Sequence, residues 1–312
     1  MNRDKSKPKV IVICGPTGSG KTAAAIELAV RFNGQIISAD SMQIYRFMDI
    51  GTAKPTLLEQ QQVQHHLIDV VTPDEPFNAA RFADMAQSLI SGLQGKGFVP
   101  FVVGGTGLYI KALLKGLFPA EPVDPALRSR LKKEAAAHGA AFLHRRLGEC
   151  DPEAAGRIHP NDTYRILRAL EIYESTGQSI SQFQSDHGFS EKPFSVLKIG
   201  LDTDRIELYE RINGRVDRMI AAGLLPEVKN LLDRGYAPTL KSMQSIGYRH
   251  LVDFLEGRLS WPEALRTFKR DTRRYAKRQL TWFKSDGEIN WVAAEDTTRM
   301  MDLANNFLTD AC

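Results

Sequence analysis

Residues 15–22 read GPTGSGKT, which matches the pattern GxxxxGK[ST] at every fixed position. An apolar run, Val10–Cys14, precedes the motif, and a segment with helical periodicity, Lys21–Phe32, follows it. Glycines let backbone N–H groups curl around phosphate oxygens, and the following helix adds its positive dipole end. The sequence therefore predicts a diphosphate-binding P-loop, in which Lys21 supplies charge and Thr22 can ligate Mg²⁺. Its residues are Gly15, Pro16, Thr17, Gly18, Ser19, Gly20, Lys21 and Thr22.

Strand and helix signals alternate around this motif, which favours a parallel sheet with ligands at its carboxyl edge. We expect an α/β fold with a P-loop NTPase-like parallel sheet core flanked by helices. The predicted strands are Val10–Cys14, Gln35–Ala39, Leu67–Val71, Phe98–Val103, Ser195–Leu201 and Ile289–Ala293. The main predicted core helices are Lys21–Phe32, Asn78–Leu93, Arg205–Ala222, Pro226–Arg234 and Trp261–Phe283.

The pattern changes near Phe118 and Pro119, where closely spaced prolines resemble a linker, and it becomes helical and strand-poor as far as about Gln184. The predicted helices there are Pro125–His138, Ala140–Leu147, Pro152–Ile158 and Thr163–Ser175. We therefore predict an all-helical insertion domain at residues 119–192 within an α/β core formed by residues 1–118 and 193–312.

Composition excludes several classes of protein. The 312 residues are 43% hydrophobic and 25% charged, which argues against a disordered or fibrous chain. Cys14, Cys150 and Cys312 form no CxxC pair, so neither a disulfide scaffold nor a zinc site is expected. No apolar run approaches the length of a membrane span, and we expect a soluble protein of a reducing cytoplasm that does not bind membranes.

Positive charge is concentrated in two segments. Arg128–Arg168 carries a net charge of +4, and Arg266–Lys284 carries +7, with Asp271 as its one acid. Because the whole chain carries +4, the remainder carries −7. This asymmetry is expected of a polyanion-binding protein, although two solvated helix faces would give the same counts.

Asp40 follows the predicted strand Gln35–Ala39 at the edge of the sheet where chemistry usually occurs. The strand Phe98–Val103 ends in glycines instead of the Asp that commonly helps a P-loop hold Mg²⁺. Asp40 could be a metal-shell acid, a general base, or a helix-capping or turn residue, and the sequence leaves these roles open. An NKxD motif is absent, which argues against a regulatory GTPase.

Three other features are weaker signals. Residues 104–107 read GGTG, which predicts a tight turn that would bring Thr106 close to a ligand at the same edge. His65 and His66 could act in proton transfer or lie at the surface. In the basic segment Arg266–Lys284, helical spacing puts the cations on one face, and Tyr164–Arg168 places an aromatic ring beside two guanidiniums, a pattern suited to RNA contact.

Taken together, the motifs resemble the tRNA dimethylallyltransferase (tRNA isopentenyltransferase) family, bacterial type, because the zinc finger of some eukaryotic members has no counterpart. The resemblance extends from about Val10 to Trp282 in family order. It rests on GPTGSGKT and on ISADSMQIYRFMDIGTAKP at 37–55, HHLIDV at 65–70, VVGGTGLYIKALL at 102–114, HPNDTYRILRALEIY at 159–173 and SIGYRHL at 245–251.

The resemblance implies transfer of a dimethylallyl group from dimethylallyl diphosphate to N6 of the adenosine 3′ of the tRNA anticodon. It implies that Asp40 is the general base, that Lys21, Thr22 and Arg215 act on the diphosphate, and that Mg²⁺ is the cofactor. We also expect a monomer with a tRNA-contacting helical domain. The residues expected to contact tRNA are Asp40, Ser41, Met42, Gln43, Thr106, Arg128, Tyr164, Arg165, Ile166, Leu167, Arg168, Gln244, Ser245, Ile246, Gly247, Tyr248 and Arg249.

Three alternatives remain from the sequence: a small-molecule kinase that uses the P-loop for ATP, an adenylate isopentenyltransferase that prenylates a free nucleotide, and a non-enzymatic RNA-binding P-loop protein. A small substrate requires neither the helical insertion nor the two basic segments, and a non-enzymatic protein leaves Asp40 without a role.

Overall fold

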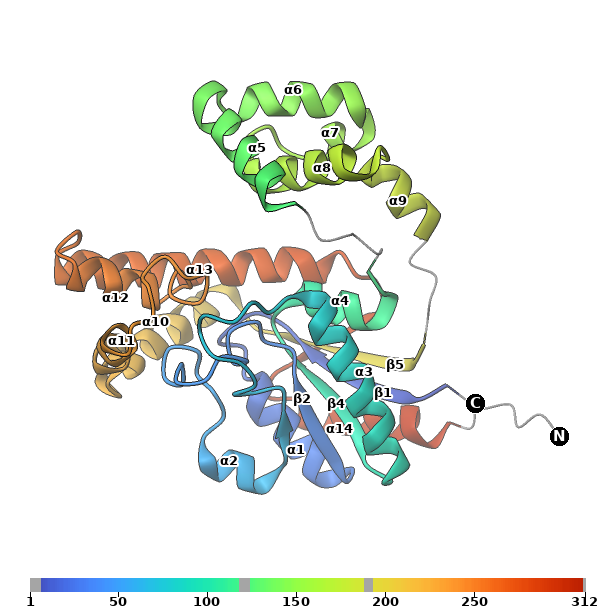
Figure 1. Cartoon of the computed structure of the whole chain (residues 1–312). Helices are drawn as coiled ribbons and strands as arrows, with labels where there is room; N and C mark the ends of the chain where they lie inside the picture. The colour runs from blue at the N-terminus through green and yellow to red at the C-terminus, as the bar shows by residue number, and fades with distance from the viewer. Residues whose placement is uncertain (1–6, 118–123, 188–192, 311–312) are drawn as a thin grey trace. The chain divides into compact units, whose positions relative to one another are not determined.

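The computed structural model describes residues 7–117, 124–187 and 193–310 (Figure 1). The chain forms two compact units: Met1–Leu114 with Lys192–Cys312, called here the core unit, and Lys115–Glu191, called the helical unit. The predicted linker around Phe118, Pro119 and Pro122 lies outside the described residues. None of the described helices is long and apolar enough to span a membrane.

The core unit contains a six-stranded sheet in the order β3-β2-β4-β1-β5-β6, and every neighbouring pair of strands is parallel. This arrangement confirms the predicted α/β fold. The strands are β1 (Lys9–Cys14), β2 (Gly34–Ser38), β3 (His65–His66), β4 (Val99–Gly104), β5 (Ser195–Asp202) and β6 (Ile289–Ala293).

The register of the central strands brings three predicted motifs to one edge of the sheet. Cys14 pairs with Gly104, and Ser38 pairs with Val103, so β1, β4 and β2 end at nearly the same level. The chain segments that follow these ends are the P-loop, the GGTG turn and Asp40. Parallel strands thus deliver residues from distant parts of the sequence to one place.

Helices cover the sheet on both faces, so the strands read as continuous apolar runs. Ile11 and Ile13 face a cluster that includes α1 (Lys21–Arg31) and α14 (Thr297–Thr309), while Val10 and Val12 on the alternate side are equally buried. Helix α3 (Ala79–Gly95) packs against β4. The remaining helices near the sheet are α2 (Leu57–Gln62) and α4 (Gly107–Lys115).

The third predicted strand is wrong in its position. The strand consists of His65–His66, which pair with Ile36 and Ile37, and the segment after it leaves the sheet. Leu67 and Asp69 have φ angles of 59° and 55°, which are incompatible with a strand, and only Val71 forms an isolated bridge. Leu67 and Val71 are buried, so the apolar run reflects packing of a loop and not strand pairing.

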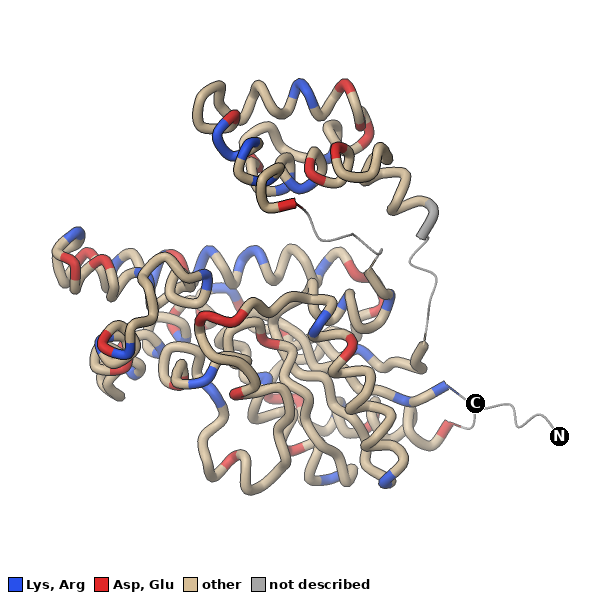
Figure 2. Tube along the Cα trace, in the orientation of Figure 1, with Lys and Arg blue, Asp and Glu red and all other residues tan. Residues whose placement is uncertain are grey.

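The carboxyl edge of the sheet is also bordered by helices from the last third of the chain. These are α10 (Arg205–Ala221), α11 (Leu224–Asp233), α12 (Tyr248–Leu255) and the 24-residue α13 (Trp261–Lys284). Leu208 and Ile212 of α10 pack on Ala276 of α13, which fixes the two helices against each other. Figure 2 shows Lys and Arg residues repeated along α13.

The helical unit contains α5 (Pro125–His138), α6 (Ala140–Cys150), α7 (Pro152–Arg157), α8 (Thr163–Thr176) and α9 (Ile180–His187). Its core is built from leucine and isoleucine side chains of α5, α6 and α8, with Leu131, Leu143 and Ile166 fully buried. Asp124, Asp151 and Asp162 accept backbone hydrogen bonds at the N-termini of α5, α7 and α8, which explains where these helices begin.

Candidate active site

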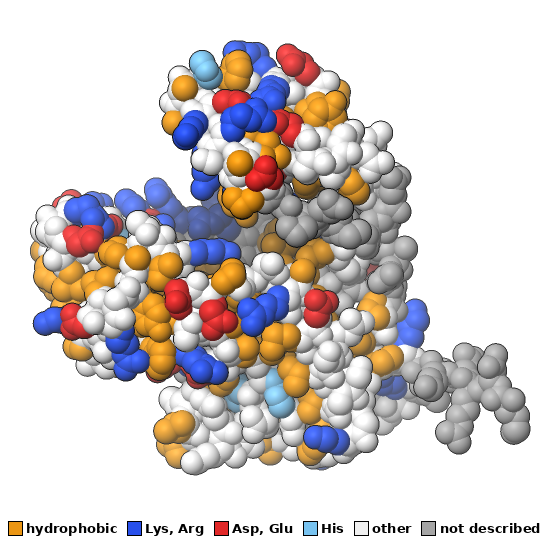
Figure 3. Space-filling model, viewed as in Figure 1, with side chains coloured by type: hydrophobic (Ala, Val, Ile, Leu, Met, Phe, Trp, Pro, Cys, Tyr) orange, Lys and Arg blue, Asp and Glu red, His pale blue; other side chains and the backbone are white. Residues whose placement is uncertain are grey.

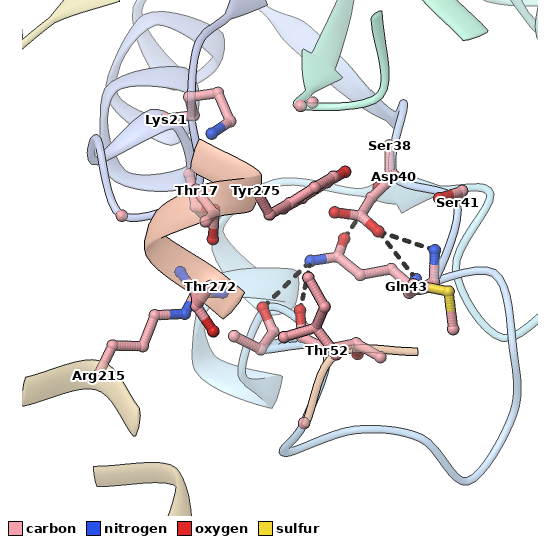
Figure 4. Close-up of a pocket in the computed structure, with 18 of the residues that line it drawn as sticks. Thr17, Lys21, Ser38, Asp40, Ser41, Gln43, Thr52, Arg215, Thr272 and Tyr275 are labelled. Atoms are coloured by element: carbon pink, nitrogen blue, oxygen red, sulfur yellow. Dashed lines mark hydrogen bonds between the residues drawn. The ribbon is translucent and has the colours of Figure 1, made fainter. Parts of the chain in front are cut away.

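A cavity of about 600 Å³ lies at the carboxyl edge of the sheet, within the core unit (Figure 4). The residues that line it come from the P-loop, from the segment after β2, from the GGTG turn, and from α10, α12 and α13. They include Thr17, Gly18, Gly20, Lys21, Thr22, Asp40, Ser41, Met42, Gln43, Gly105, Arg215, Gln244, Ser245, Ile246, Tyr248, Thr272, Tyr275, Arg278 and Gln279.

The P-loop leaves its helix N-terminus open for an anion. Gly20, the N-cap of α1, has a φ of 89°, and no side chain caps the helix there. Ser19 is buried, and its hydroxyl donates to the carbonyl oxygen of Pro16 at 2.9 Å, which fixes the loop from inside. The free amides of the first helical turn, together with the helix dipole, therefore form an anion-binding site at the cavity wall.

Two cations face this site. Lys21 donates to the carbonyl oxygen of Pro16 at 2.6 Å, and burial together with the nearby Arg215 guanidinium lowers its pKa to about 8. Burial also lowers the pKa of Arg215, although the Asp40 carboxylate opposes this shift. Among the described residues, Arg215 has neither a hydrogen bond nor an ion pair. Because burial disfavours the charged form of both side chains, both would gain from a bound polyanion.

The two carboxylate oxygens of Asp40 have different surroundings. Oδ1 accepts hydrogen bonds from the amide nitrogens of Met42 at 2.8 Å and Gln43 at 3.3 Å, so Asp40 does form the turn that the sequence allowed. Within the described residues, no donor contacts Oδ2. Figure 4 shows the carboxylate of Asp40 and the ring of Tyr275 directed toward the same space. A free carboxylate oxygen in a cavity with an anion site suits proton abstraction.

The turn that carries Asp40 is held by its neighbours. Thr106 accepts a hydrogen bond from the amide of Ser41 at 3.0 Å, and its own amide donates to the carbonyl oxygen of Ala39 at 3.2 Å. Gln43 accepts from the Ser38 hydroxyl and donates to two backbone carbonyl oxygens, those of Thr52 and Ala53. The amide side chain of Gln43 is thus used within the protein.

The segment 244–249 contributes to the cavity in different ways. Gln244, Ser245, Ile246 and Tyr248 all line it, but the Tyr248 hydroxyl is bound to Glu227 and its ring is fully buried. Gly247 has a φ of 95° and turns the chain into α12. The Arg249 guanidinium donates to Asp271 at 2.6 Å.

The remaining predicted tRNA contacts belong to the helical unit. Ile166 is fully buried and Leu167 is nearly so, and both belong to the core of the helical unit. The predicted contact of these two side chains with RNA is therefore wrong. Tyr164 is 70% exposed. The buried Glu171 carboxylate pairs with the guanidiniums of Arg128, at 3.1 Å, and Arg168, at 3.4 Å. These arginines are partly exposed and held in place.

Sequence reasoning missed the inner face of α13. Thr272, Tyr275 and Gln279 reach the cavity from one stripe of this helix, and Arg278 lines the cavity beside the Tyr275 ring. The available signal was their helical spacing on the face opposite the basic residues. Burial, with the Asp40 carboxylate as a further cause, raises the pKa of Tyr275 to about 12, so its hydroxyl remains a proton-bearing donor near Asp40.

The donor atoms present fit a hard cation such as Mg²⁺ only in part. The Thr22 hydroxyl lines the cavity and has no hydrogen-bond partner among the described residues. Within residues 7–117, 124–187 and 193–310, no group of three or more His, Cys, Asp or Glu side chains could hold a metal ion. A metal ion there would take its other ligands from the diphosphate and from water, as oxygen-preferring Mg²⁺ commonly does.

An anion-binding loop, two cations and a free carboxylate in one cavity define a P-loop enzyme that transfers a group from a diphosphate. The family described as IPP transferase matches residues 43–286, and the chain belongs to this family. It is 58% identical over 287 residues to the tRNA dimethylallyltransferase of Desulfosudis oleivorans, covering 92% of this chain and 91% of that protein.

Two solved structures are similar along nearly the whole chain. The tRNA isopentenylpyrophosphate transferase of Bacillus halodurans superposes with a TM-score of 0.73 at 41% identity, covering 97% of both chains. A eukaryotic dimethylallyltransferase acting on tRNA superposes with a TM-score of 0.82 at 30% identity, covering 96% of this chain and 79% of that one. The family resemblance predicted from the motifs is confirmed.

Proposed function

We propose that this protein transfers a dimethylallyl group from dimethylallyl diphosphate to N6 of the adenosine 3′ of the anticodon in tRNA. The observation that carries the proposal is the Asp40 carboxylate, whose free Oδ2 shares one cavity with the P-loop. A kinase would use the same loop for a nucleotide, but the chain belongs to a family described as IPP transferase, which favours an isoprenoid diphosphate in this loop.

The diphosphate binds to the open amides of the P-loop, with Lys21 and Arg215 on its oxygens. During transfer, the bond between the allylic C1 and the bridging oxygen breaks, and diphosphate leaves with the electron pair. Negative charge grows on the leaving group, where fixed donors and cations stabilise it most. Mg²⁺, held by Thr22 and the diphosphate oxygens, would supply further charge neutralisation when bound.

The N6 amine of adenosine forms the new bond to C1. Its proton moves to Oδ2 of Asp40, while Oδ1 remains bound to the turn and keeps the carboxylate in place. The base must leave the anticodon stack to reach the cavity. Ser41, Met42 and the segment 244–246 line the same cavity and would contact this extruded base.

The rest of the tRNA would lie against basic surfaces. In the core unit, the outer face of α13 presents Arg266, Arg274 and Lys277, all of them exposed. Figure 3 shows positive side chains gathered along the edge of the core unit where α13 runs. In the helical unit, Tyr164, Arg165, Arg168 and Arg128 would contact the RNA. We further propose that the protein acts as a monomer in the cytoplasm.

Incubation with labelled dimethylallyl diphosphate and either unmodified tRNA, AMP or ATP tests the proposal. We expect label in tRNA alone, at the adenosine next to the anticodon when the nucleosides are analysed by mass. Label in AMP would indicate an adenylate isopentenyltransferase, and phosphate transfer from ATP would indicate a kinase. RNA binding without any transfer would indicate a non-enzymatic protein.

A further inference from the structure

Gln279 joins two loops that the sequence places far apart. Its side chain projects from α13 and is 7% exposed. Oε1 accepts a hydrogen bond from the amide nitrogen of Thr17 at 2.9 Å, and Nε2 donates to the carbonyl oxygen of Gly105 at 2.8 Å. One amide group therefore spans the space between the P-loop and the GGTG turn.

The orientation of this amide is determined by its partners. A flipped amide would set its NH₂ group against the Thr17 N–H and its oxygen against the Gly105 carbonyl, with repulsion at both ends. The approach is also close, because a Cβ atom on Gly105 would lie 2.2 Å from Nε2 of Gln279. A glycine at 105 is thus required for the bridge to form.

The two bridged loops adjoin the leaving-group site and the proposed base. Thr17 belongs to the loop that would bind the diphosphate. Gly105 precedes Thr106, whose hydrogen bonds to Ser41 and Ala39 hold the turn that carries Asp40. The bridge therefore connects the proposed leaving-group site, through Gly105 and Thr106, to the turn that carries the proposed base.

We propose that Gln279 is a positioning residue that sets the separation of the diphosphate loop from the turn of Asp40. The inference rests on the proposed function, and it assigns Gln279 no contact with either substrate. A displacement of about 1 Å between reacting groups can cost about 100-fold in rate. Loss of the bridge should therefore slow the chemical step while each substrate still binds.

The variant Gln279→Glu tests this role, because its carboxyl group changes with pH. When ionised it can accept from Thr17 but repels the Gly105 carbonyl oxygen, and when protonated it can make both contacts. At pH 8 we expect single-turnover transfer to fall roughly 10- to 100-fold relative to the parent, with substrate dissociation constants changed less than about threefold. When the pH is lowered from 8 to 5.5, the ratio of variant to parent rate should rise at least about fivefold.

Two further variants make the result decisive. Gln279→Met fills a similar volume without either hydrogen bond, so its rate ratio should stay low at every pH. Gln94→Glu is the matched control, because Nε2 of Gln94 also donates to a backbone carbonyl oxygen, that of Lys9, on a segment that does not line the cavity. Its rate ratio should stay near one.

Three results would overturn the bridge: a rate ratio for Gln279→Glu that does not vary with pH, parental rates for Gln279→Met, or a matching loss of tRNA and diphosphate affinity in both variants. The parent enzyme separates this test from that of the function itself. A parent that transfers no dimethylallyl group refutes the proposed function, whereas an active parent with a pH-independent Gln279→Glu refutes the positioning role alone.

Discussion

The hydroxyl of Tyr248 donates to Oε1 of Glu227 at 2.5 Å, and the same carboxylate accepts three backbone N–H groups. Those amides belong to Asp49, Ile50 and Gly51. A larger residue does not fit at Gly51, because its Cβ would lie 2.5 Å from the Tyr248 ring. Glu227 therefore fastens the loop after Asp40 to α11 and α12, and this loop in turn holds the Gln43 side chain.

Glu227→Gln should destabilise the protein. Replacing one oxygen by an NH₂ group sets donor against donor, and an unsatisfied donor costs about 1–3 kcal/mol when buried. We expect the lower half of that range, because the Glu227 carboxylate is only partly buried. Urea unfolding measures the change, with Glu27→Gln on the exposed face of α1 as a control that should stay within about 0.5 kcal/mol. Equal stability of both variants would contradict this role.

The affinity for dimethylallyl diphosphate should fall at alkaline pH. The pKa of Lys21 is about 8 in the free enzyme, and a diphosphate binds the charged form. The contribution of Lys21 is then fully present below pH 8 and is lost as the pH rises through that value. Isothermal titration between pH 7 and pH 10 measures this, and the dissociation constant should rise by up to about tenfold per pH unit above pH 8.

Lys21→Arg provides the control, since a guanidinium keeps its charge over this range. Its dissociation constant should vary little with pH. A parent enzyme whose affinity is constant up to pH 10 would show that the Lys21 charge does not act on the diphosphate.

Neutralising Arg274 and Lys277 together should weaken tRNA binding and flatten its salt dependence. Arg274 is 65% exposed at its side chain, and its nearest acid lies 3.9 Å away. Each lost phosphate contact lowers the salt slope by about one unit. Arg273 is a poorer target, because it donates to Asn213 at 2.6 Å and so supports the packing of α10 on α13.

Filter binding at several salt concentrations measures the slope for Arg274→Gln/Lys277→Gln. The control is Arg31→Gln/Lys96→Gln, which removes two cations near the ends of α1 and α3, far along the chain from α13. Identical slopes in the double variant and the parent would assign this face of α13 to solvent.

The parts of the fold that could be predicted are those set by local sequence. The strand before Gly15 and the helix from Lys21 follow from one apolar run and one glycine-rich loop, and the helix Pro125–His138 begins at an Asp cap. The shifted third strand was not predictable, because Leu67–Val71 is apolar for burial and its chain direction depends on positive φ angles.

The site shows the same division. Lys21, Thr22 and Asp40 could be found because each occupies a fixed place next to a strand end. Gln279 could not, because its partners Thr17 and Gly105 lie 262 and 174 residues away and no local pattern marks such a contact. The packing of α13 across the sheet edge, which only tertiary structure reveals, brings these residues together.

The single-turnover rate of Asp40→Asn at saturating substrates tests the central proposal most directly. The amide oxygen can still accept from Met42 and Gln43, so the turn, tRNA binding and diphosphate binding should persist. Because the amide cannot take the N6 proton, transfer should slow about 10²- to 10⁴-fold. Recovery of the rate at high Mg²⁺ would identify Asp40 as a metal-shell acid instead. A variant that transfers the dimethylallyl group at the parent rate would contradict the account.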